Sequence, residues 1–507
     1  MECPIPVTTT GPAVPGTAYE PVIGLEVHAQ LATRSKMFCG CSRDYWDAAP
    51  NSHVCPVCLG MPGVLPVINS RAVELTVLTG LAMGCTIPPR AKFDRKNYPY
   101  PDLMKGYQIS QYDEPLCVGG ALEVDVDGEP RTVHLERIHL EEDTARLLHR
   151  DDENGARSLL DVNRAGVPLM EIVTRPDMHS AQQAVAFLRA LRQLLRYIGA
   201  SDADMEKGSF RCDANVSLRP RGERALGTKV EVKNMNSFRA VGRAIESEIR
   251  RQRAALEAGE RIVQETRGYL EASGETAPQR SKEEAHDYRY FPEPDLPPLL
   301  LDEGRVGKLG AVLAELPGAR RRRFEQEYGL TPDEARTLTE SRERADDYER
   351  TVHLASGLSG IGDRDDYPRT VAHWFTGDVA RLLNTLGSDA ELRDTQLTPG
   401  HVAELAGLVA EGTITATTAK QVLDIAFESG ELPQSIVQSH GLAQVRDEGE
   451  IDRLAREVIQ AQPKAVADYL GGKESAIGFL VGQLMRQARG RADPQNAARV
   501  LRRHLDG

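Results

Sequence analysis

The chain has 507 residues and a formal net charge of −13, so it is too long for one ordinary core and too acidic to coat nucleic acid over its whole surface. No apolar run approaches the ~20 residues that span a bilayer, and the first residues lack the charged and then apolar pattern of a signal peptide. We therefore expect a cytoplasmic protein of roughly three domains without membrane attachment. Residues 1–18 are rich in Pro, Thr and Gly with little periodicity, which predicts a disordered extension.

The first regular element is a predicted strand over residues 22–28. Its apolar residues alternate with polar ones, so Glu26 and His28 share one face. This face is either one wall of a polar pocket or the solvated side of an antiparallel sheet, and one strand alone does not decide between them.

Four of the eight cysteines form a cluster with paired spacing, C-x-C and C-x-x-C, separated by thirteen residues. In a reducing compartment this spacing is more typical of a tetrahedral zinc site than of disulfides, with free cysteines as the alternative. Four thiolates leave no open coordination position, so the zinc would be structural. The predicted ligands are Cys39, Cys41, Cys55 and Cys58.

Residues 92–102 combine basic, aromatic and acidic side chains, including Lys96, more densely than a turn requires. A solvated turn is the simpler interpretation. Together with carboxylates elsewhere, the segment supplies what transfer from ATP needs, namely cations for the phosphates and carboxylates for Mg²⁺.

Two amphipathic helices are predicted over residues 180–197 and 237–258, and both would back the sheet. Between them, residues 212–218 and 229–234 predict a hairpin whose loop contains Pro and Gly. Because Asp and Asn are depleted in strands that merely face water, this hairpin favours the pocket interpretation. Its polar faces comprise Asp213, Asn215, Ser217, Lys229, Glu231 and Lys233.

The predicted fold class is α+β, with a sheet domain first and helical domains after it. Residues 19–301 alternate short strands with Gly and Pro, which predicts an antiparallel-sheet catalytic domain. The Pro-rich segment 281–298 marks either a linker or an ordered loop over a site. Helical spacing and caps then predict an all-α linker domain over 302–395 and an all-α tail domain over 396–507.

The end of the chain is locally basic, because residues 481–507 hold six arginines against two aspartates. Local positive charge within an acidic chain is typical of an RNA-binding face. The arginines are Arg486, Arg489, Arg491, Arg499, Arg502 and Arg503.

The polar residues predict charge stabilisation as the means of catalysis. Carboxylates at Glu26, Glu142 and Glu231 would neutralise a hard cation, and lysines beside them suit a polyphosphate. The nearest approach to a phosphate-binding loop, residues 222–229, has Thr before Lys and precedes a strand, so we reject it. The G-x-S-x-G nucleophile elbow is absent from the sequence.

Eight motifs carry a family resemblance that spans nearly the whole chain after Ala18. They are VIGLEVH (22–28), KFDRKNYPYP (92–101), YQISQ (107–111), HLEED (139–143), DVNR (161–164), RCDAN (211–215), DYRYFPEP (287–294) and GFLVGQ (478–483). Together they resemble the B-subunit family of the bacterial aspartyl/glutamyl-tRNA amidotransferases.

The resemblance implies an ATP-dependent enzyme that repairs mischarged tRNA. In that family the B subunit uses ATP and Mg²⁺ to phosphorylate the side-chain carboxylate of Glu on tRNA(Gln) or Asp on tRNA(Asn), and ammonia then displaces phosphate. The ammonia comes from glutamine hydrolysed by an amidase-type A subunit, and a small C subunit completes a heterotrimer. A cradle-like catalytic domain, a helical linker and a tRNA-contacting tail are also implied.

By matching motif, the resemblance implies a role for each of the polar residues. The metal would be surrounded by Glu26, His28, Glu142 and Glu231. The residues implied to bind ATP or to orient the substrate carboxylate are Lys96, Asp213, Asn215 and Lys233. The four cysteines resemble a zinc knuckle that only some family members keep. The alternative function is a non-catalytic, tRNA-binding scaffold subunit with a zinc knuckle.

Overall fold

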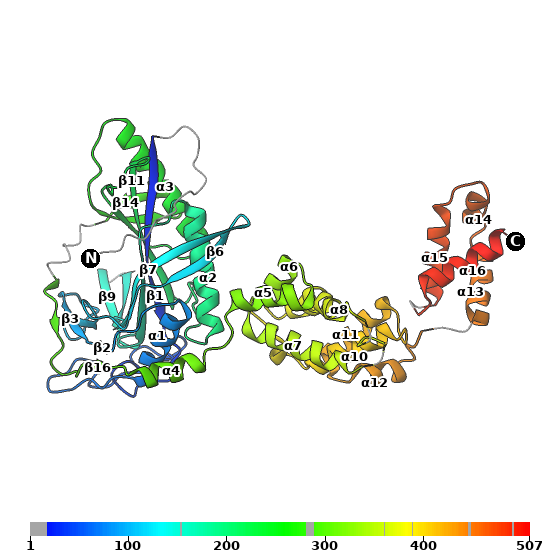
Figure 1. Cartoon of the computed structure of the whole chain (residues 1–507), viewed down its shortest axis with the longest axis horizontal. Helices are drawn as coiled ribbons and strands as arrows, with labels where there is room; N and C mark the ends of the chain where they lie inside the picture. Colours follow the sequence, from blue (N-terminus) through cyan, green and yellow to red (C-terminus); the bar gives the residue numbers. More distant parts are fainter. Residues whose placement is uncertain are drawn as a thin grey trace. The chain divides into compact units, whose positions relative to one another are not determined.

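The computed structural model shows two compact units, Met1–Leu316 and Pro317–Gly507, and each is described by itself (Figure 1). The predicted extension, up to residue 17, lies outside the described residues, as do Arg489 and the first residue of the DYRYFPEP motif. The structure describes residues 18–152, 155–279, 288–358, 360–362, 364–387, 389–444, 448–488 and 491–506.

The first unit is built around a nine-stranded sheet in which β1 (Tyr19–Gln30) lies between β10 and β11. All of its strand pairs are antiparallel except β12 with β13, so the predicted antiparallel sheet is confirmed apart from that one pair. In sheet order the remaining strands are β14 (Glu275–Pro278), β13 (Thr266–Leu270), β12 (Val230–Lys233), β11 (Phe210–Pro220), β10 (Pro168–Thr174), β7 (Glu129–Glu142) and β5 (Cys117–Val118), with β6 (Ala121–Val126) also paired to β7.

Three smaller sheets surround the main one. A three-stranded sheet consists of β15 (Phe291–Pro292), β3 (Asp94–Asn97) and β4 (Tyr107–Ser110). The two-stranded sheets pair β16 (Leu299–Leu300) with β2 (Arg90–Ala91), and β8 (Arg146–Asp152) with β9 (Gly155–Asp161). The Pro-rich segment therefore adds a short strand to the unit, which favours the ordered loop over the linker.

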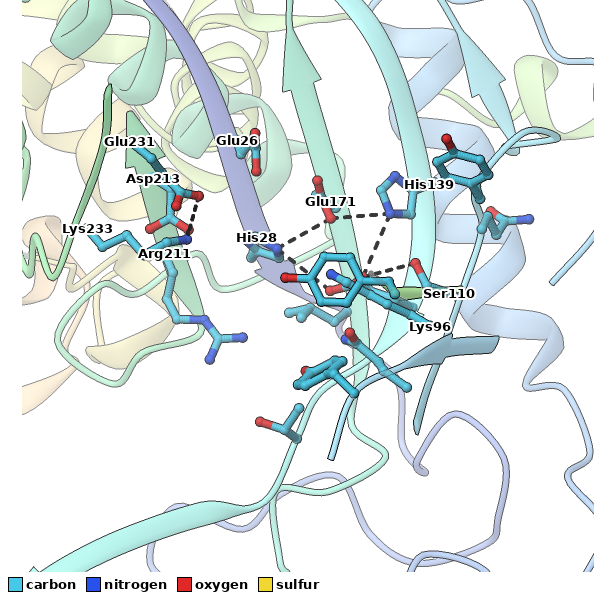
Figure 2. Close-up of a pocket in the computed structure, with 18 of the residues that line it drawn as sticks. Glu26, His28, Lys96, Ser110, His139, Glu171, Arg211, Asp213, Glu231 and Lys233 are labelled. Atoms are coloured by element: carbon cyan, nitrogen blue, oxygen red, sulfur yellow. Dashed lines mark hydrogen bonds and ion pairs between the residues drawn. The ribbon is translucent and has the colours of Figure 1, made fainter. Parts of the chain in front are cut away.

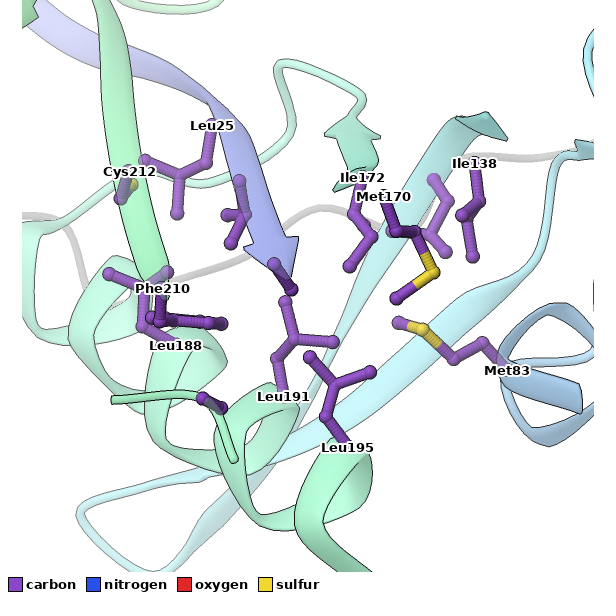
Figure 3. Close-up of a cluster of buried hydrophobic side chains, with 14 of the residues drawn as sticks. Leu25, Met83, Ile138, Met170, Ile172, Leu188, Leu191, Leu195, Phe210 and Cys212 are labelled. Carbon is purple, nitrogen blue, oxygen red and sulfur yellow. The ribbon is translucent and has the colours of Figure 1, made fainter. Parts of the chain in front are cut away.

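Helix α2 (Ala181–Tyr197) packs its apolar stripe against one face of the main sheet. Ser180 accepts a hydrogen bond from the Gln183 backbone N–H and so caps the helix. Leu191 and its neighbours at helical spacing meet Met170 and Ile172 of β10 in the core (Figure 3). Burial of each such leucine contributes roughly 1.5–3 kcal/mol. Because this face is sealed by α2, functional polar groups must lie on the opposite face.

Both helices predicted in the first half are confirmed. Helix α3 (Phe238–Glu257) begins after Ser237, whose hydroxyl accepts from the Ala240 backbone N–H, and it packs against α2 and β11. The described residues of this unit also form the helices α1 (Ser70–Ala82) and α4 (Glu303–Ala311).

The second unit is helical throughout its described residues and contains two separate hydrophobic clusters. The first cluster runs from Phe324 to Val437 and the second from Ile451 to Leu501. Around the first lie α5 (Pro317–Tyr328), α6 (Pro332–Leu338), α7 (Arg342–Ser356), α8 (Tyr367–Trp374), η2 (Phe375–Val379), α9 (Ala380–Leu383), η3 (Leu392–Asp394), α10 (Pro399–Ala410), α11 (Ala416–Ser429) and α12 (Pro433–Ser439). Around the second lie α13 (Glu448–Ala461), α14 (Pro463–Leu470), α15 (Ala476–Gln487) and α16 (Pro494–Asp506).

The cores divide the chain at other positions than the predicted domain limits. Residues of α4, such as Val306, pack on the core of the first unit, so helical structure begins before Pro317. Helices α7 and α10 pack together across the predicted limit at 395/396. The first cluster therefore continues past that limit as far as Leu442, and the limits of the linker and tail domains stay a prediction. Within the part of the chain that the structure describes, each helix is too short or too polar to cross a membrane.

Candidate functional site

The register of the main sheet aligns polar residues from four strands in one row. His28 on β1 pairs with Arg211 on β11 and with Glu171 on β10, and Glu171 pairs in turn with His139 on β7. Side chains alternate along a strand, so directly paired residues lie on the same face of a sheet. All four residues of this row therefore project away from the core helices.

Neighbouring rows on the same face are also polar. Two residues before His28 on β1, Glu26 pairs with Asp213, which follows Arg211 by two residues on β11. Two residues further, Asn215 on β11 pairs with Glu231 on β12. In the opposite direction Leu169 pairs with Glu141. Side chains alternate between the two faces of the sheet. Apolar side chains therefore fill the core on one face, while carboxylates, imidazoles and amides lie together on the other.

These rows form the floor of a cavity of about 890 Å³. Lys96 of β3 and tyrosines from the segment after residue 287 add further walls. Figure 2 shows two groups of side chains in it, one around Asp213, Glu231 and Lys233, the other around His28, Glu171 and His139. Of the eight residues predicted for catalysis or Mg²⁺, all except Glu142 line this cavity.

His28, Glu141 and Glu171 are the one group in the described part of this cavity with three closely spaced metal-ligating side chains, whose ligand atoms lie within 4.8 Å of one another. His28 Nε2 lies 3.5 Å from Glu171 Oε2 and 3.7 Å from Glu141 Oε1. Two carboxylates with several open positions suit Mg²⁺, which takes oxygen ligands and keeps some of its waters. The donor set therefore fits a divalent cation.

Opposite charges stabilise one another within this group and between it and the adjacent His139. Burial alone would lower the pKa of His139, but the charge of Glu171 and hydrogen bonds to Glu141 and Glu171 outweigh it and raise that pKa to about 9. For His28, burial also lowers the pKa, and the hydrogen bond to Glu171 raises it above its ordinary value overall. Burial opposes ionisation of Glu171, yet the two imidazoles hold its pKa well below the usual range. The carboxylates therefore favour the protonated form of both histidines.

A second group of charges lies around Lys233. Its Nζ is 2.5 Å from Asp213 Oδ2 and 2.7 Å from Glu231 Oε1. Thr266 Oγ1 donates to the other Glu231 oxygen at 2.8 Å. Burial opposes the Lys233 ammonium, but Asp213 and Glu231 raise its pKa overall. The predicted hairpin residues are thus brought together as an ion-pair network with the lysine at its centre.

Glu26 lies between the two groups. Asn215 Nδ2 donates to Glu26 Oε1 at 2.9 Å. Burial, followed by the charges of Glu171 and Glu231, raises the pKa of Glu26. A carboxylate with a raised pKa in a cavity is a better proton acceptor than an ordinary one.

Lys96 faces the His28 group from β3. Burial works against its charge, but the charges of Glu141 and of neighbouring groups raise its pKa. Its Nζ lies 4.9 Å from the ring centroid of Tyr288. The site thus combines the Lys96 cation with two carboxylates that could hold a metal ion.

The position of Glu142 corrects the predicted metal site. Glu142 does not line the cavity in the structure, because it follows Glu141 by one residue on β7 and so projects from the other face. Its carboxylate accepts from Lys105 Nζ at 2.6 Å and from the Ile109 backbone N–H at 3.0 Å. Glu26 and Glu231 line the cavity without joining the His28 group. The expected set of four ligands is therefore not one cluster.

Sequence reasoning missed Glu141, Glu171 and His139. Glu171 is the one charged residue in the apolar stretch PLMEIVT, and that isolation was an available signal. The HLEED motif contains His139 and Glu141, but it has two adjacent glutamates. The sequence alone does not show which of the two faces the cavity. Only the register shows that His139 and Glu141 share the face of His28.

A buried network connects the cavity with the cysteine knuckle, residues 39–58. Arg211 Nη2 donates to Asp143 Oδ1 at 3.0 Å, and Gln30 Nε2 donates both to Asp143 Oδ2 at 2.8 Å and to the Tyr45 hydroxyl at 3.0 Å. Burial opposes ionisation of Asp143, yet Arg211 and Arg164 lower its pKa to about 2. The knuckle thus contributes a hydrogen-bond acceptor to the support of Arg211.

The four predicted zinc ligands come together. The sulfurs of Cys39, Cys41, Cys55 and Cys58 lie within 4.8 Å of one another, and those of Cys55 and Cys58 are 3.9 Å apart. Tetrahedral zinc with bonds of about 2.3 Å places its sulfur ligands at nearly that spacing. The hydrogen bond from Cys39 lowers the pKa of Cys58 to about 4, which favours a thiolate there. The cluster therefore fits a structural zinc ion.

Comparisons with known proteins agree with this geometry. A sequence model described as "GatB/GatE catalytic domain" matches residues 21–306, and one described as "GatB domain" matches residues 360–505. The first match covers the whole cavity, so the sheet unit corresponds to a catalytic domain. The chain belongs to the GatB family.

Three full-length relatives each carry the name of the B subunit of an aspartyl/glutamyl-tRNA(Asn/Gln) amidotransferase. The protein of Thermomicrobium roseum is 55% identical over 487 residues, which cover 96% of this chain and 99% of the relative. That of Dehalococcoides mccartyi is 52% identical over 491 residues, covering 97% and 99%. That of Carboxydothermus hydrogenoformans is 49% identical over 488 residues, covering 96% and 99%. The resemblance expected from the eight motifs is confirmed.

Proposed function

We propose that this chain is the ATP-using subunit of a glutamine-dependent aminoacyl-tRNA amidotransferase. It would phosphorylate the side-chain carboxylate of Glu on tRNA(Gln), or of Asp on tRNA(Asn), and replace phosphate with ammonia. The names of the relatives support the reaction class. The observation that carries the proposal is the strand register, which gathers two carboxylates and two imidazoles from two neighbouring rows next to Lys96.

Mg²⁺ is the cation that the His28 group would hold, and when bound it would neutralise charge on the phosphates of ATP. Glu141 and Glu171 would supply oxygen ligands and His28 would supply Nε2. The Lys96 ammonium would face the same phosphates. Lys233, Asp213 and Asn215, on the other side of Glu26, would bind the rest of ATP or orient the substrate carboxylate.

The reaction then has two steps. An oxygen of the substrate carboxylate attacks the γ-phosphorus of ATP, and the bond from that phosphorus to the bridging oxygen breaks. ADP departs, and the substrate becomes an acyl phosphate. Ammonia attacks the acyl carbon and phosphate leaves with the bonding electrons. One proton must leave the nitrogen, and Glu26 would accept it because its pKa is raised. Charge stabilisation and positioning would account for most of the rate.

This chemistry needs partners. The G-x-S-x-G elbow is absent from the sequence, and we propose that an amidase-type A subunit hydrolyses glutamine to supply the ammonia, with a small C subunit completing the complex. The subunit names of the relatives support a multi-subunit enzyme. A cytoplasmic location remains a prediction.

The tail would contact tRNA. Arg486 on α15, together with Arg499, Arg502 and Arg503 on α16, is exposed, which supports the proposal of a basic face. Zinc held by the four cysteines would stabilise the knuckle without taking part in the reaction.

Amidation by the complete complex tests the function. We expect Glu171→Gln to reduce ATP-dependent amidation of mischarged tRNA by about 100-fold or more, because it removes a charged ligand at the site of phosphoryl transfer. Glutaminase activity and assembly should persist. Glu275→Gln makes the same charge change at an exposed position of β14 and should leave amidation unchanged.

Full amidation by the Glu171→Gln complex would contradict the assignment. If wild-type chain also failed to bind Mg·ATP, the alternative of a non-catalytic tRNA-binding scaffold would be favoured.

A further inference from the structure

A wall of tyrosines lines the cavity beside Lys96 and has no part in the phosphoryl-transfer and amidation steps. Tyr98, Tyr112, Tyr288 and Tyr290 all border the cavity. Tyr112 and Tyr290 stack with ring centroids 4.4 Å apart and an interplanar angle of 11°. Tyr98 and Tyr288 meet edge to face at 5.6 Å.

Two of these rings have a local role, but Tyr112 does not share it. Lys96 Nζ lies 4.9 Å from the Tyr288 centroid and 5.9 Å from that of Tyr98, so those two rings stabilise its charge. Tyr112 stacks on Tyr290 with 52% of its surface exposed. Half-exposed aromatic surface at the edge of a polar cavity is what a planar ligand would cover.

The segment that carries Tyr288 and Tyr290 is held in place by specific contacts. Arg95 donates to both carboxylate oxygens of Glu293, at 2.7 and 2.8 Å. Asn97 Nδ2 donates to the Arg289 carbonyl at 2.9 Å. Arg289, between the two tyrosines, has φ of +42°, a conformation uncommon for a residue with a side chain and often found at binding sites.

Tyr112 is anchored as well. Its backbone N–H donates to Asp94 Oδ2 at 3.0 Å, and Asp94 is 1% exposed and paired with Lys92. Two chain segments far apart in the sequence are therefore fixed so that their rings stack. A preorganised stack of this kind binds a planar partner with little loss of conformational freedom.

We propose that the Tyr112–Tyr290 stack is the binding site for an adenine ring. This inference rests on the proposed function, in which both substrates carry adenine: ATP in its base, and tRNA in its 3′-terminal nucleotide next to the esterified amino acid. In either case the charged end of the ligand must reach Lys96 and the carboxylates while the base stays outside them. Tyr288 and Tyr98 lie against the Lys96 ammonium, so the tyrosine wall adjoins the cation that the charged end must reach.

Stacking of adenine requires only the aromatic ring of Tyr112 and not its hydroxyl group. Two substitutions of Tyr112 therefore form a matched pair. Tyr112→Leu removes the ring, whereas Tyr112→Phe keeps it and removes only the hydroxyl. Because Tyr112 is half exposed, neither change creates a cavity in the core. Tyr100→Leu is the control, because Tyr100 is 55% exposed in the same region and is not among the residues that border the cavity.

The experiment has two arms, both with the complete complex. In the first, calorimetry measures the affinity for Mg·ATP and for magnesium triphosphate, which has no base. In the second, the KM for mischarged tRNA is measured, and a tRNA with 2-aminopurine in place of its terminal adenine reports stacking by quenching of its fluorescence.

Loss of one stacked base by Tyr112→Leu should weaken binding by about tenfold in the arm that supplies the adenine. If ATP weakens and triphosphate does not, the base of ATP is the occupant. If the tRNA KM rises and the quenching disappears, the terminal adenosine is the occupant. Tyr112→Phe should match wild type in both arms.

Unchanged affinity in both arms for Tyr112→Leu would overturn the proposal. An equal loss of affinity for Mg·ATP and for magnesium triphosphate would overturn the proposal too, because the Tyr112 ring would then act on the phosphates. Such results leave the proposed function intact as long as Glu171→Gln still abolishes amidation, so the two failures are distinguishable.

Discussion

Glu171 and His28 are direct register partners on β10 and β1, and Glu171 Oε2 lies 3.5 Å from His28 Nε2. Their pairing continues to His139 on β7, whose Nε2 lies 3.3 Å from the same oxygen. A single carboxylate thus links two imidazoles across three strands. Any change in the ionisation of one member must alter the others.

This linkage predicts that divalent cations bind more tightly as pH rises. Burial lowers the pKa of His28, but the hydrogen bond and charge of Glu171 raise it overall, above its ordinary value of 6.5. A cation needs the neutral ring, so it must displace the proton below that pKa. Affinity for Mg²⁺, or for Mn²⁺ as its probe, should therefore increase as the pH rises above about 6.5 and the ring loses its proton. Calorimetric titrations at several pH values measure this.

The variant His28→Asn serves as the control for the pH effect. It keeps an oxygen donor but cannot hold a proton, so its affinity should change less with pH than that of wild type. An equally steep dependence in both proteins would place the titrating group elsewhere.

Lys233 should be required for ATP binding. It neutralises Asp213 and Glu231 at 2.5 and 2.7 Å, with Glu26 nearby. Lys233→Met would leave these carboxylates unpaired in the cavity, where they would repel the triphosphate. We expect the Kd for Mg·ATP to rise about tenfold or more. Lys207→Met, the same charge change at an exposed turn, should leave Kd unchanged, and a matching loss there would indicate a general effect of net charge.

Replacement of one zinc ligand should remove the metal and destabilise the first unit. Cys58→Ser breaks a closed four-thiolate site, so elemental analysis should find no zinc where wild type holds one ion per chain. The midpoint of thermal unfolding should fall by about 5 °C or more, since each kcal/mol lost corresponds to roughly 2–4 °C in a unit of this size. Cys85→Ser, outside the cluster, should retain zinc. Full zinc content in Cys58→Ser would refute the site.

Truncation after Gln444 should weaken tRNA binding and spare ATP binding. The cut lies between the two helical clusters, so it removes α13 to α16 without exposing the first cluster. A shorter chain ending before Thr398 would cut through that cluster, in which Val402 packs. We expect a weaker tRNA affinity with a shallower dependence on salt, because arginine–phosphate contacts are lost. An unchanged salt slope would rule out the basic tail as a contact.

Elements whose signal is local were predictable from the sequence. The strand over 22–28, the hairpin after residue 212 and the helices over 180–197 and 237–258 depend on neighbouring residues alone, and all are confirmed. The clustering of the four cysteines was predictable because their spacing is carried by two short motifs.

The composition of the His28 group was not predictable in the same way. It depends on which of two adjacent glutamates faces the cavity, and Glu141 rather than Glu142 does so only because β7 pairs with β10 in one register. Register is set by long-range pairing, which one sequence does not display. The packing of α7 with α10 was not predictable for a related reason, since α8, η2, α9 and η3 separate these two helices in the sequence.

Along the central strands, residues that face the cavity alternate with residues that face the core. This alternation limits which insertions and deletions the strands can accept. An insertion of one residue in β10 before Glu171 would turn that carboxylate toward α2 and send Ile172 into the cavity, so fold and chemistry would fail together. Only even-numbered length changes within these strands keep both faces in phase. Natural variation in strand length should therefore gather in the hairpin turns, such as the one between β11 and β12, and leave the central strands untouched.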